Sequence, residues 1–363
     1  MTVVRRLAAL SLVAAFRAAP AIAAWPNYGP PALVDSLAVS PVDGAVYAGT
    51  AEGLYRSLAH GRTWSRIGPD LTINHVPETL AVDSANTLFV VLARDGGVFK
   101  SSDGGQTLVQ LPNGLPRACY ERSHVAIAPL QPSTIYLARC GIFRSRDAGA
   151  SWTQVPFSGA VSVLAVHPRD PRRVLAGTDS VWISDDGGDT WRAAAFERCN
   201  IVLDLQFDPS NPARVLSAVW GTYEVARSED GGESWVRSSD GYFGYGASAL
   251  AIDPQDPKTT YVTTHGIGAF PPELPYPPGP YPTGVNRSTD GGLSWRSLEG
   301  SPSSADLLAT DPTGKWIYAA SWGAPGVSAY EARPERSPVI RPAPRDRSPR
   351  PVERTPVQSA EAR

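Results

Sequence analysis

Two acidic residues, Glu121 and Asp306, have the chemistry that glycoside hydrolysis requires, namely a pair of carboxyl groups that flank the scissile bond. Both fall in segments that we expect to be loops on one face of the molecule. The sequence does not determine the distance between them, and any exposed loop carries such acids. We therefore assign no catalytic residue and keep these two as candidates.

A second group of residues in the same loops could bind a ligand. Flat aromatic side chains suit sugar rings or proline-rich peptides, and an insertion at 266–284 adds further aromatic residues and seven prolines. Long loops often carry binding sites. The alternative is that these side chains only pack the loops against one another. The candidates are Arg122, Trp220, Tyr242, Phe243, Tyr245, His265 and Trp322.

Histidine is another residue type that could do chemistry here. His75, His124 and His265 are expected on the same face, but they belong to three different repeats and could share a metal ion only near the centre. The sequence contains no G-x-S-x-G, H-E-x-x-H or C-x-x-C motif and no phosphate-binding loop. We expect neither a metal site nor another cofactor.

Six copies of one short motif must position these loops. The consensus is S-x-D-x-G-x-[ST]-W, and it recurs every 40 to 60 residues or so, a period that indicates a solenoid, a propeller or a repeat array. The third position of successive copies is occupied by Ala59, Asp103, Asp147, Asp186, Asp230 and Asp290.

The motif has a structural explanation. Its Asp side chain can accept hydrogen bonds from backbone N–H groups of its own turn. The Gly two residues later supplies the positive φ that a tight hairpin requires, and the Trp begins the next strand. We therefore interpret Asp103, Asp147, Asp186, Asp230 and Asp290 as structural residues rather than as ligand-binding ones.

Each repeat has the layout of a propeller blade. Short apolar runs separated by turns predict four strands in each unit. The first of these runs occurs seven times, which indicates seven blades although the motif occurs six times. The last unit lacks the fourth strand, and the segment 24–28 resembles that strand. We predict an all-β fold, a single seven-bladed β-propeller of four-stranded blades closed by an N-terminal strand.

The ends of the chain are not expected to belong to the propeller, which we assign to 24–331. Residues 1–23 combine a basic start, an apolar stretch and an A-x-A cleavage site, which is typical of a signal peptide. The alternative is an uncleaved membrane anchor. Residues 332–363 are rich in Arg and Pro and predict a disordered tail, either a spacer or a weak electrostatic arm for anionic lipid or polysaccharide.

The formal net charge of −2 combines two basic ends with an acidic body. An acidic body argues against nucleic-acid binding, which needs a basic face to contact phosphates. The signal peptide predicts a periplasmic or secreted protein without a transmembrane segment after cleavage. We expect a monomer whose ligand is a protein or a glycan.

The three cysteines fall in loops on one face. In an oxidising compartment we expect Cys119 and Cys140 to pair, because both belong to the third blade. Cys199 would then stay free. The alternative is three unpaired thiols.

The six motifs resemble those of the Asp-box, or BNR, repeat proteins, and the resemblance covers about 24–331. One copy has Leu108 in place of Trp, and the first has Ala59 in place of Asp. Proteins with such motifs include sialidases, two-propeller xyloglucanases, sortilin-type receptors and photosystem II assembly factors, and this chain looks most like exported bacterial BNR-repeat proteins. The resemblance implies the propeller fold, and it does not by itself imply a function.

The enzymes that carry these motifs have features that this sequence lacks. Sialidases are expected to carry an arginine in an [FY]-R-I-P segment ahead of the first motif, whereas Arg66 follows it. Xyloglucanase-type enzymes use a cleft between two propellers, and this chain predicts one. Our main interpretation is therefore an exported non-catalytic binding or assembly scaffold that recognises a glycan or a protein on its loop-rich face. The alternatives are a sialidase-like glycoside hydrolase and a photosystem II assembly factor-like protein.

Overall fold

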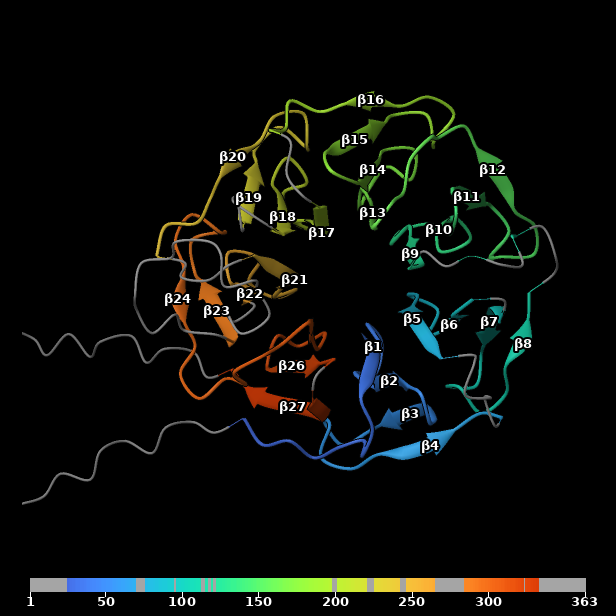
Figure 1. The fold of residues 1–363 in the computed structure, drawn as a ribbon, viewed down its shortest axis with the longest axis vertical. Helices are drawn as coiled ribbons and strands as arrows, with labels where there is room; N and C mark the ends of the chain where they lie inside the picture. The colour runs from blue at the N-terminus through green and yellow to red at the C-terminus, as the bar shows by residue number, and fades with distance from the viewer. Residues whose placement is uncertain are drawn as a thin grey trace, which may run out of the picture. The chain divides into compact units, whose positions relative to one another are not determined.

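The computed structural model describes residues 25–69, 76–94, 96–111, 115–116, 119, 122–197, 201–220, 225–241, 246–264, 284–322 and 324–332. The predicted signal peptide and the predicted tail beyond Ala332 lie outside these residues. The described residues contain no helix, and their strands form seven antiparallel sheets. Figure 1 shows the sheets arranged as blades around one axis, which confirms the predicted all-β, seven-bladed propeller.

Blades 1 to 4 each contain four strands in sequential order. Blade 1 comprises β1 (Val34–Val39), β2 (Val46–Thr50), β3 (Gly53–Ser57) and β4 (Ser65–Ile67). Blade 2 comprises β5 (Pro77–Val82), β6 (Leu88–Leu92), β7 (Gly97–Ser101) and β8 (Val109–Gln110). Blade 3 comprises β9 (His124–Ile127), β10 (Ile135–Ala138), β11 (Ile142–Ser145) and β12 (Thr153–Val155). Blade 4 comprises β13 (Val163–Val166), β14 (Val174–Gly177), β15 (Val181–Ser184) and β16 (Arg192–Ala193).

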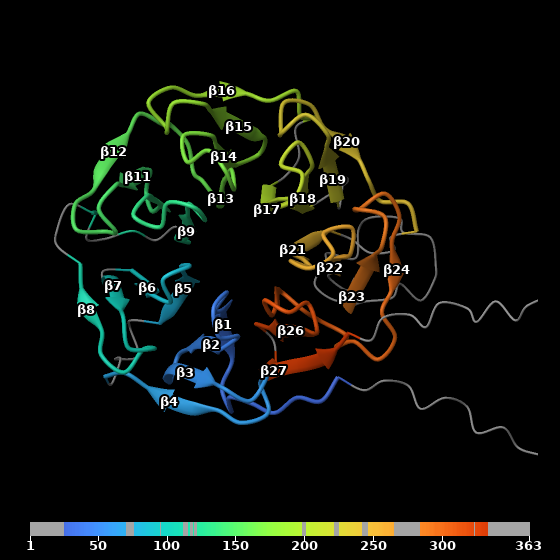
Figure 2. The same ribbon diagram turned by 180° about the vertical axis from the view of Figure 1, so that it is seen from behind.

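Blades 5 and 6 repeat this pattern, and the sheet of blade 7 has three strands. Blade 5 comprises β17 (Ile201–Phe207), β18 (Val215–Trp220), β19 (Val225–Ser228) and β20 (Val236–Arg237). Blade 6 comprises β21 (Ala247–Ile252), β22 (Thr260–Thr264), β23 (Gly284–Ser288) and β24 (Arg296–Ser297). Blade 7 comprises β25 (Leu307–Thr310), β26 (Trp316–Ser321) and β27 (Ala324–Glu331). The first strands of blades 1 to 6 lie nearest the axis, as both views of the ring show (Figure 1 and Figure 2).

The hydrophobic core is divided into layers between neighbouring blades. One layer, for example, packs Tyr47 and Leu54 of blade 1 against Leu88 and Val90 of blade 2. Because the blades are covered on both faces, second strands such as β2, β6 and β10 are buried along their whole length. They therefore do not show the alternation of buried and exposed residues that a sheet with one solvated face shows. Each blade is therefore stabilised by its two neighbours.

Side chains near the start of the inner strands also join successive blades by hydrogen bonds. The Ser36 hydroxyl donates to the Pro77 carbonyl (2.5 Å), and the Thr79 hydroxyl donates to the Ser123 carbonyl (2.5 Å). The bonds that continue this series around the ring link Leu164 N–H to His124 Nδ1 (3.2 Å), Ser162 Oγ to Val202 O, Leu250 N–H to Asp204 Oδ2 (2.8 Å) and Ser248 Oγ to Ala305 O (3.4 Å). We call this series the inner hydrogen-bond ring.

The Asp-box motif folds the turn between the third and fourth strands. In blade 4, Asp186 accepts hydrogen bonds from the Thr190 backbone N–H (2.9 Å), the Thr190 hydroxyl (2.6 Å) and the Ser184 hydroxyl (2.8 Å). These bonds lower the pKa of Asp186 to about 2, the side-chain bond from Thr190 having the largest effect. Gly187 and Gly188 adopt φ values of 83° and 95°. The Asp186 carboxylate therefore accepts all three of these hydrogen bonds from its own turn.

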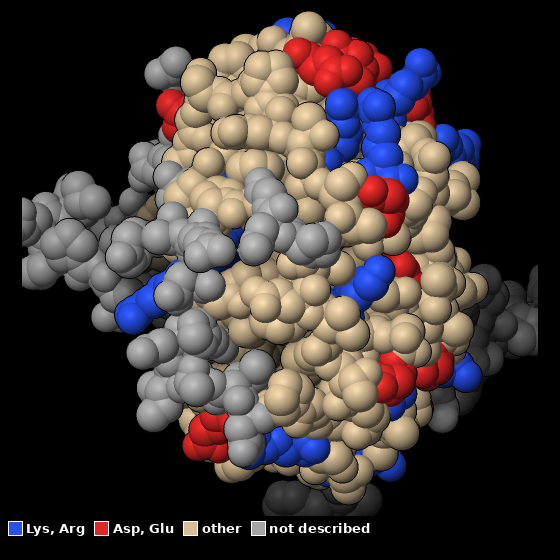
Figure 3. Space-filling model, turned by 90° about the vertical axis from the view of Figure 1, so that its right-hand side faces the viewer, with Lys and Arg blue, Asp and Glu red and all other residues tan. Residues whose placement is uncertain are grey.

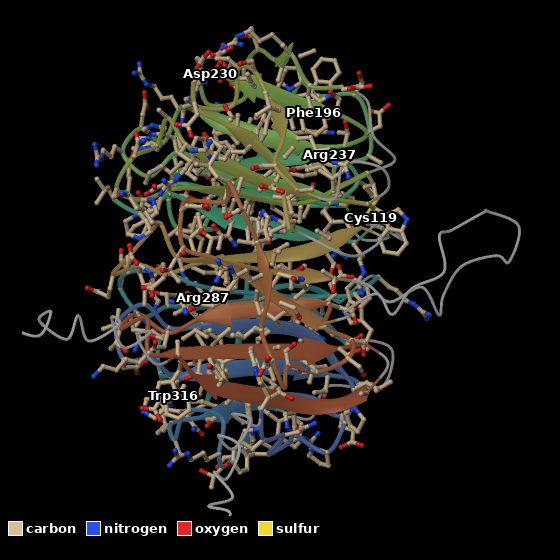
Figure 4. All side chains as sticks on the ribbon, turned by 90° about the vertical axis from the view of Figure 1, so that its left-hand side faces the viewer. Cys119, Phe196, Asp230, Arg237, Arg287 and Trp316 are labelled. Atoms are coloured by element: carbon tan, nitrogen blue, oxygen red, sulfur yellow. A yellow bond between two sulfur atoms is a disulfide. The ribbon has the colours of Figure 1, made fainter. Side chains whose placement is uncertain are left out.

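The first box keeps the turn without the carboxylate. Ser57 Oγ still accepts the backbone N–H groups of Ala59 (3.3 Å) and Gly61 (2.9 Å), as the box serines of the other blades do. The boxes lie on the face opposite to Cys119, since Figure 4 shows Asp230 and Cys119 toward opposite sides of the ring. The Asp residues of the boxes are therefore remote from the loop-rich face.

The rim of the ring carries mixed charges. Figure 3 shows Lys and Arg side chains interspersed with Asp and Glu on one side of the molecule. On the rim of blades 4 and 5, Arg173 pairs with Asp185 (2.6 Å) and Glu233 (2.9 Å), and Arg192 pairs with Asp185 (2.8 Å). Such exposed pairs contribute little individually, but this network joins two adjacent blades.

The N-terminal segment closes the ring, as predicted. Residues 25–33 run antiparallel to β27 through isolated bridges between Asn27 and Ser328 and between Leu33 and Pro325. The Trp25 ring, which is 8% exposed, stacks on Tyr330 with centroids 4.9 Å apart. This segment supplies the outer strand of blade 7, so the first and last parts of the described chain share one sheet.

Truncation of Trp25 tests this closure. We expect Trp25→Ala to lower the free energy of unfolding by about 3–5 kcal/mol, because it removes a large buried side chain. Chemical denaturation of the purified protein measures the effect. The matched control is Tyr28→Ala, which truncates a 45% exposed ring in the same segment and should change stability by at most about 0.5 kcal/mol. Equal effects of the two variants would contradict the closure.

Candidate functional site

A pocket of about 580 Å³ lies at the axis, where the inner strands begin. All seven blades contribute to it, because the first strands converge there (Figure 1). We call it the axial pocket. Its polar and aromatic lining residues are Asp35, Ser36, Glu78, Thr79, Arg122, Ser123, His124, Ser162, Asp204, Gln206, Ser248, Asp306 and Trp322.

Three of the acids occupy one register position of the repeat. Asp35, Glu78 and Asp306 each stand two residues before the leucine of the first apolar run. The ladders of β1 and β5 are irregular at this point, between Val34 and Ser36 and on either side of Glu78. Because a bulge leaves one residue out of the ladder and redirects its side chain, the repeat turns Asp35 and Glu78 toward the axis.

Asp204 lies one position later, on β17, which carries the same irregularity. Its carboxylate accepts the backbone N–H groups of Leu205 and Leu250, each at 2.8 Å, and it is only partly exposed. Burial raises the pKa of Asp204 to about 6 in spite of these bonds. Asp204 is therefore able to hold or release a proton near neutral pH.

Asp306 lies in the same pocket in a different environment. It is 7% exposed and accepts hydrogen bonds from the Trp322 backbone N–H (2.8 Å) and the Ser321 hydroxyl (3.1 Å). Ser321 ends β26 and Trp322 follows it, so the end of this strand holds the carboxylate in place. Asp306 can thus present a fixed oxygen to a ligand.

The remaining two acids lie beside arginines. The Arg139 guanidinium is buried and reaches Glu78 at 3.5 Å, the Ser123 hydroxyl at 3.0 Å and the Leu92 carbonyl at 3.1 Å. Burial raises the pKa of Asp35, and the positive charge of Arg122 opposes this shift. The pocket therefore combines an excess of acids with two nearby cations.

His124 adds a neutral hydrogen-bonding group to the pocket. Burial lowers its pKa to about 4, so the ring is uncharged at neutral pH. Its Nδ1 accepts the Leu164 N–H at 3.2 Å, which leaves the proton of the neutral ring on Nε2. This nitrogen can donate to a hydroxyl group of a bound ligand. No set of three or more His, Cys, Asp or Glu residues within the described ranges is arranged to bind a metal ion.

The lining of the pocket includes a cation–π pair. The Arg122 guanidinium lies 4.2 Å from the centroid of the Trp322 ring, and Trp322 is 37% exposed. Arg122 precedes β9 of blade 3, and Trp322 follows β26 of blade 7. An exposed indole beside acids is a suitable surface for the apolar face of a sugar ring.

The structure brings together some of the residues predicted from the sequence. Asp306, Arg122 and Trp322 all line the axial pocket, whereas Trp220 ends β18 outside that lining. The Cys119 and Cys140 sulfurs form a disulfide with the Cα atoms 5.8 Å apart. Several predicted residues lie outside the described ranges, namely Glu121, Tyr242, Phe243, Tyr245, His265 and Cys199.

Sequence reasoning missed three of the pocket acids. It searched the loops, whereas Asp35, Glu78 and Asp204 belong to the inner strands themselves. The signal was available, since alignment of the seven first runs places Asp35 and Glu78 in the register of Asp306. Polar residues at a position that is otherwise apolar or small indicate a surface that faces the axis.

Comparison with known proteins relates the chain to xyloglucanases. A xyloglucanase of Hypocrea jecorina is 29% identical over 321 residues, which cover 76% of this chain and 33% of that protein. The xyloglucanase Xgh74A of Acetivibrio thermocellus is 31% identical over 256 residues, which cover 62% of this chain and 26% of that protein. The chain thus spans about a third or less of the length of these curated relatives. No family model matches it.

Solved structures show the same fold. The GH74 enzyme of Niastella koreensis superposes with a TM-score of 0.67 at 16% identity, covering 85% of this chain and 55% of that one. YCF48 from Cyanidioschyzon merolae superposes with a TM-score of 0.59 at 13% identity, covering 85% of this chain and 99% of that one. At these identities the likeness extends to the propeller alone.

These comparisons correct our main interpretation of function. The expected non-catalytic scaffold, and with it the inclination against an enzyme, is wrong, because the matched relatives are xyloglucanases. The prediction gave too much weight to the single propeller. The relatives are about three to four times the length matched here, so one propeller in this sequence does not argue against glycosidase chemistry. Of the alternatives, the glycoside hydrolase is favoured, and the relatives that favour it are xyloglucanases rather than sialidases.

The raised pKa of Asp204 predicts a pH-dependent loss of stability. Folding disfavours the charged form of Asp204. The stabilisation that comes with the raised pKa is therefore complete below pH 4, where the carboxyl group is protonated, and is lost as the pH rises through about 6. Relative to Asp204→Asn, the wild type should lose up to about 3 kcal/mol between pH 4 and pH 7. Urea denaturation at both pH values measures this difference. Glu299→Gln, on an exposed turn, retains Asp204 and should lose stability as the wild type does. Parallel curves for all three proteins would contradict the assignment.

Proposed function

We propose that this protein is a glycoside hydrolase that cleaves a xyloglucan-like glycan in the axial pocket. The observation that carries the proposal is the contrast between two carboxyl groups, Asp204 with its pKa raised to about 6 and Asp306 held by two hydrogen-bond donors. Glycosidases need one carboxyl group that carries a proton and a second that does not. The pocket offers Asp204 for the first role and, for the second, Asp306, whose position is held by hydrogen bonds.

The roles follow from these environments. Asp204, when protonated, donates its proton to the glycosidic oxygen and thereby assists departure of the leaving sugar. Asp306 acts from blade 7, two blades away around the ring, as the carboxylate that activates water or attacks the sugar. His124 Nε2–H donates to a sugar hydroxyl, and the acid-rich wall stabilises the positive charge that develops on the sugar ring.

The comparisons support this substrate class. Relatives that match 76%, 67% and 62% of the chain are named xyloglucanases, and their substrate, a glycan, is what an exposed tryptophan beside carboxyl groups suits. We extend the proposal to location, because the predicted signal peptide at 1–23 would export the protein to polysaccharides outside the cytoplasm. The described residues include no helix with the length and hydrophobicity to cross a bilayer. Membership of the Asp-box family is part of this proposal.

Substitution of the two carboxyl groups tests the proposal. Asp204→Asn and Asp306→Asn should each lower kcat on xyloglucan or its oligosaccharides by about 10²–10⁴-fold, measured as reducing ends released. Wild-type activity should fall as the pH rises through about 6, because Asp204 then loses its proton. Glu299→Gln serves as the control and should keep full activity. Unchanged turnover in both Asn variants would refute the assignment.

A further inference from the structure

A second pocket lies at the outer edge of blade 5. It has a volume of about 290 Å³, and none of its lining residues lines the axial pocket. These residues are Phe196, Glu197, Ala226, Trp235, Val236 and Arg237. Figure 4 shows Phe196 and Arg237 on the Cys119 side of the ring, away from Asp230. We call this cavity the edge pocket.

One position of the repeat explains why a pocket forms at this blade. The position belongs to the third strand and stands two residues before the serine of the Asp box. It is aromatic in blades 1 to 4, and its occupants in blades 1 to 6 are Tyr55, Phe99, Phe143, Trp182, Ala226 and Asn286. Blade 5 thus has a methyl group where the four preceding blades have a ring.

Blade 4 shows how the ring packs when it is present. There, Phe157 lies edge-to-face against Trp182 and Trp191, with ring centroids 5.8 and 5.2 Å apart. In blade 5, Phe196 and Trp235 make the equivalent of the second contact at 5.5 Å, and the first has no counterpart because the residue is alanine. This alanine is 1% exposed and lies deepest in the lining. The edge pocket therefore lies where a third ring packs in blade 4.

The lining combines apolar rings with two charges of opposite sign. The indole N–H of Trp235 donates to the Gly232 carbonyl (2.8 Å), so this ring presents apolar surface to the pocket. Arg237 pairs with Ala226 across β19 and β20, which places both side chains on the same face of the sheet. Arg237 and Glu197 are exposed, and together they offer hydrogen-bond donors and acceptors without a net charge. Such a lining suits a neutral ring that carries hydroxyl groups.

We propose that the edge pocket is a second, non-catalytic glycan-binding site, which takes one pyranose ring of a neutral polysaccharide. This inference rests on the proposed function for its choice of glycan, and it adds a site that holds the polymer. A volume of about 290 Å³ is at the lower end of the roughly 300–1,000 Å³ typical of ligand pockets, which agrees with a single ring. A chain that occupies both pockets is held more tightly than one that occupies either alone.

The first experiment measures retardation of the protein in native gels that contain soluble xyloglucan. Ala226→Trp restores the ring that blade 4 has and should weaken binding of the polymer about tenfold or more, because it fills the pocket. Arg237→Ala and Glu197→Ala each remove one hydrogen-bonding group and should weaken binding about three- to tenfold. The matched control is Arg296→Ala, which removes an exposed arginine from the outer strand of blade 6 and should bind as the wild type does.

Two further measurements separate the edge pocket from the axial pocket. Ala226→Trp should hydrolyse short xyloglucan oligosaccharides with the kcat of the wild type, because the axial pocket is unchanged. Asp204→Asn should lose turnover and still be retarded by the polymer. Thermal unfolding checks that Ala226→Trp is folded, and the two exposed positions, Glu197 and Arg237, test the pocket without altering the core.

The outcomes distinguish the two proposals. Wild-type retardation of all three pocket variants would overturn the edge pocket and leave the glycosidase function standing. Retardation that depends on these three positions, in a protein that cleaves no xyloglucan substrate, would support the edge pocket and overturn the glycosidase function. A wild type that xyloglucan does not retard would overturn the inference, and calorimetric binding of indole in its place would assign the pocket to an aromatic side chain of another protein.

Discussion

The propeller depends on the inner hydrogen-bond ring, in which polar side chains near the start of the inner strands of blades 1 to 6 reach the backbone of the next blade. Ser36, Thr79 and Asp204 show the principle, since each bonds to the strand that follows around the ring. Each of these three side chains donates or accepts a hydrogen bond while it lines the axial pocket. These links between blades place polar residues at the centre of a fold whose other interior positions are apolar.

The candidate site is a consequence of these links. A ring of inward-facing polar positions can be changed from hydroxyl to carboxyl without loss of the link between blades, as Asp204 demonstrates by accepting the Leu250 N–H. The cost is a carboxylate in a poorly hydrated place, which is why its pKa rises to about 6. The group that holds two blades together is thus the group best suited to carry a proton. Structural and chemical roles overlap at this residue.

Much of the fold could be predicted from the sequence because it repeats. The Asp boxes, the seven apolar first runs and the strand near Trp25 gave the number of blades and the closure, since each rests on local turn chemistry or on period. The site could not be predicted in the same way. Asp35 and Glu78 point to the axis because of irregular strand pairing, which depends on neighbouring strands and is not visible in one segment. The Arg122–Trp322 contact joins blades that are far apart in sequence.

The disulfide between Cys119 and Cys140 also supports the two arginines that lie beside the pocket acids. Cys140 directly follows Arg139, and Cys119 stands three residues before Arg122, so both arginines that lie beside the pocket acids are attached to one covalent link. Asp35, Glu78 and Asp204, in contrast, are positioned by strand pairing, and Asp306 is held by bonds from Ser321 and Trp322. The two signs of charge in the pocket therefore have independent supports. Protein with both thiols reduced would lose the covalent support of its cations, so oxidation of Cys119 and Cys140 would be the step that completes the charge pattern of the site.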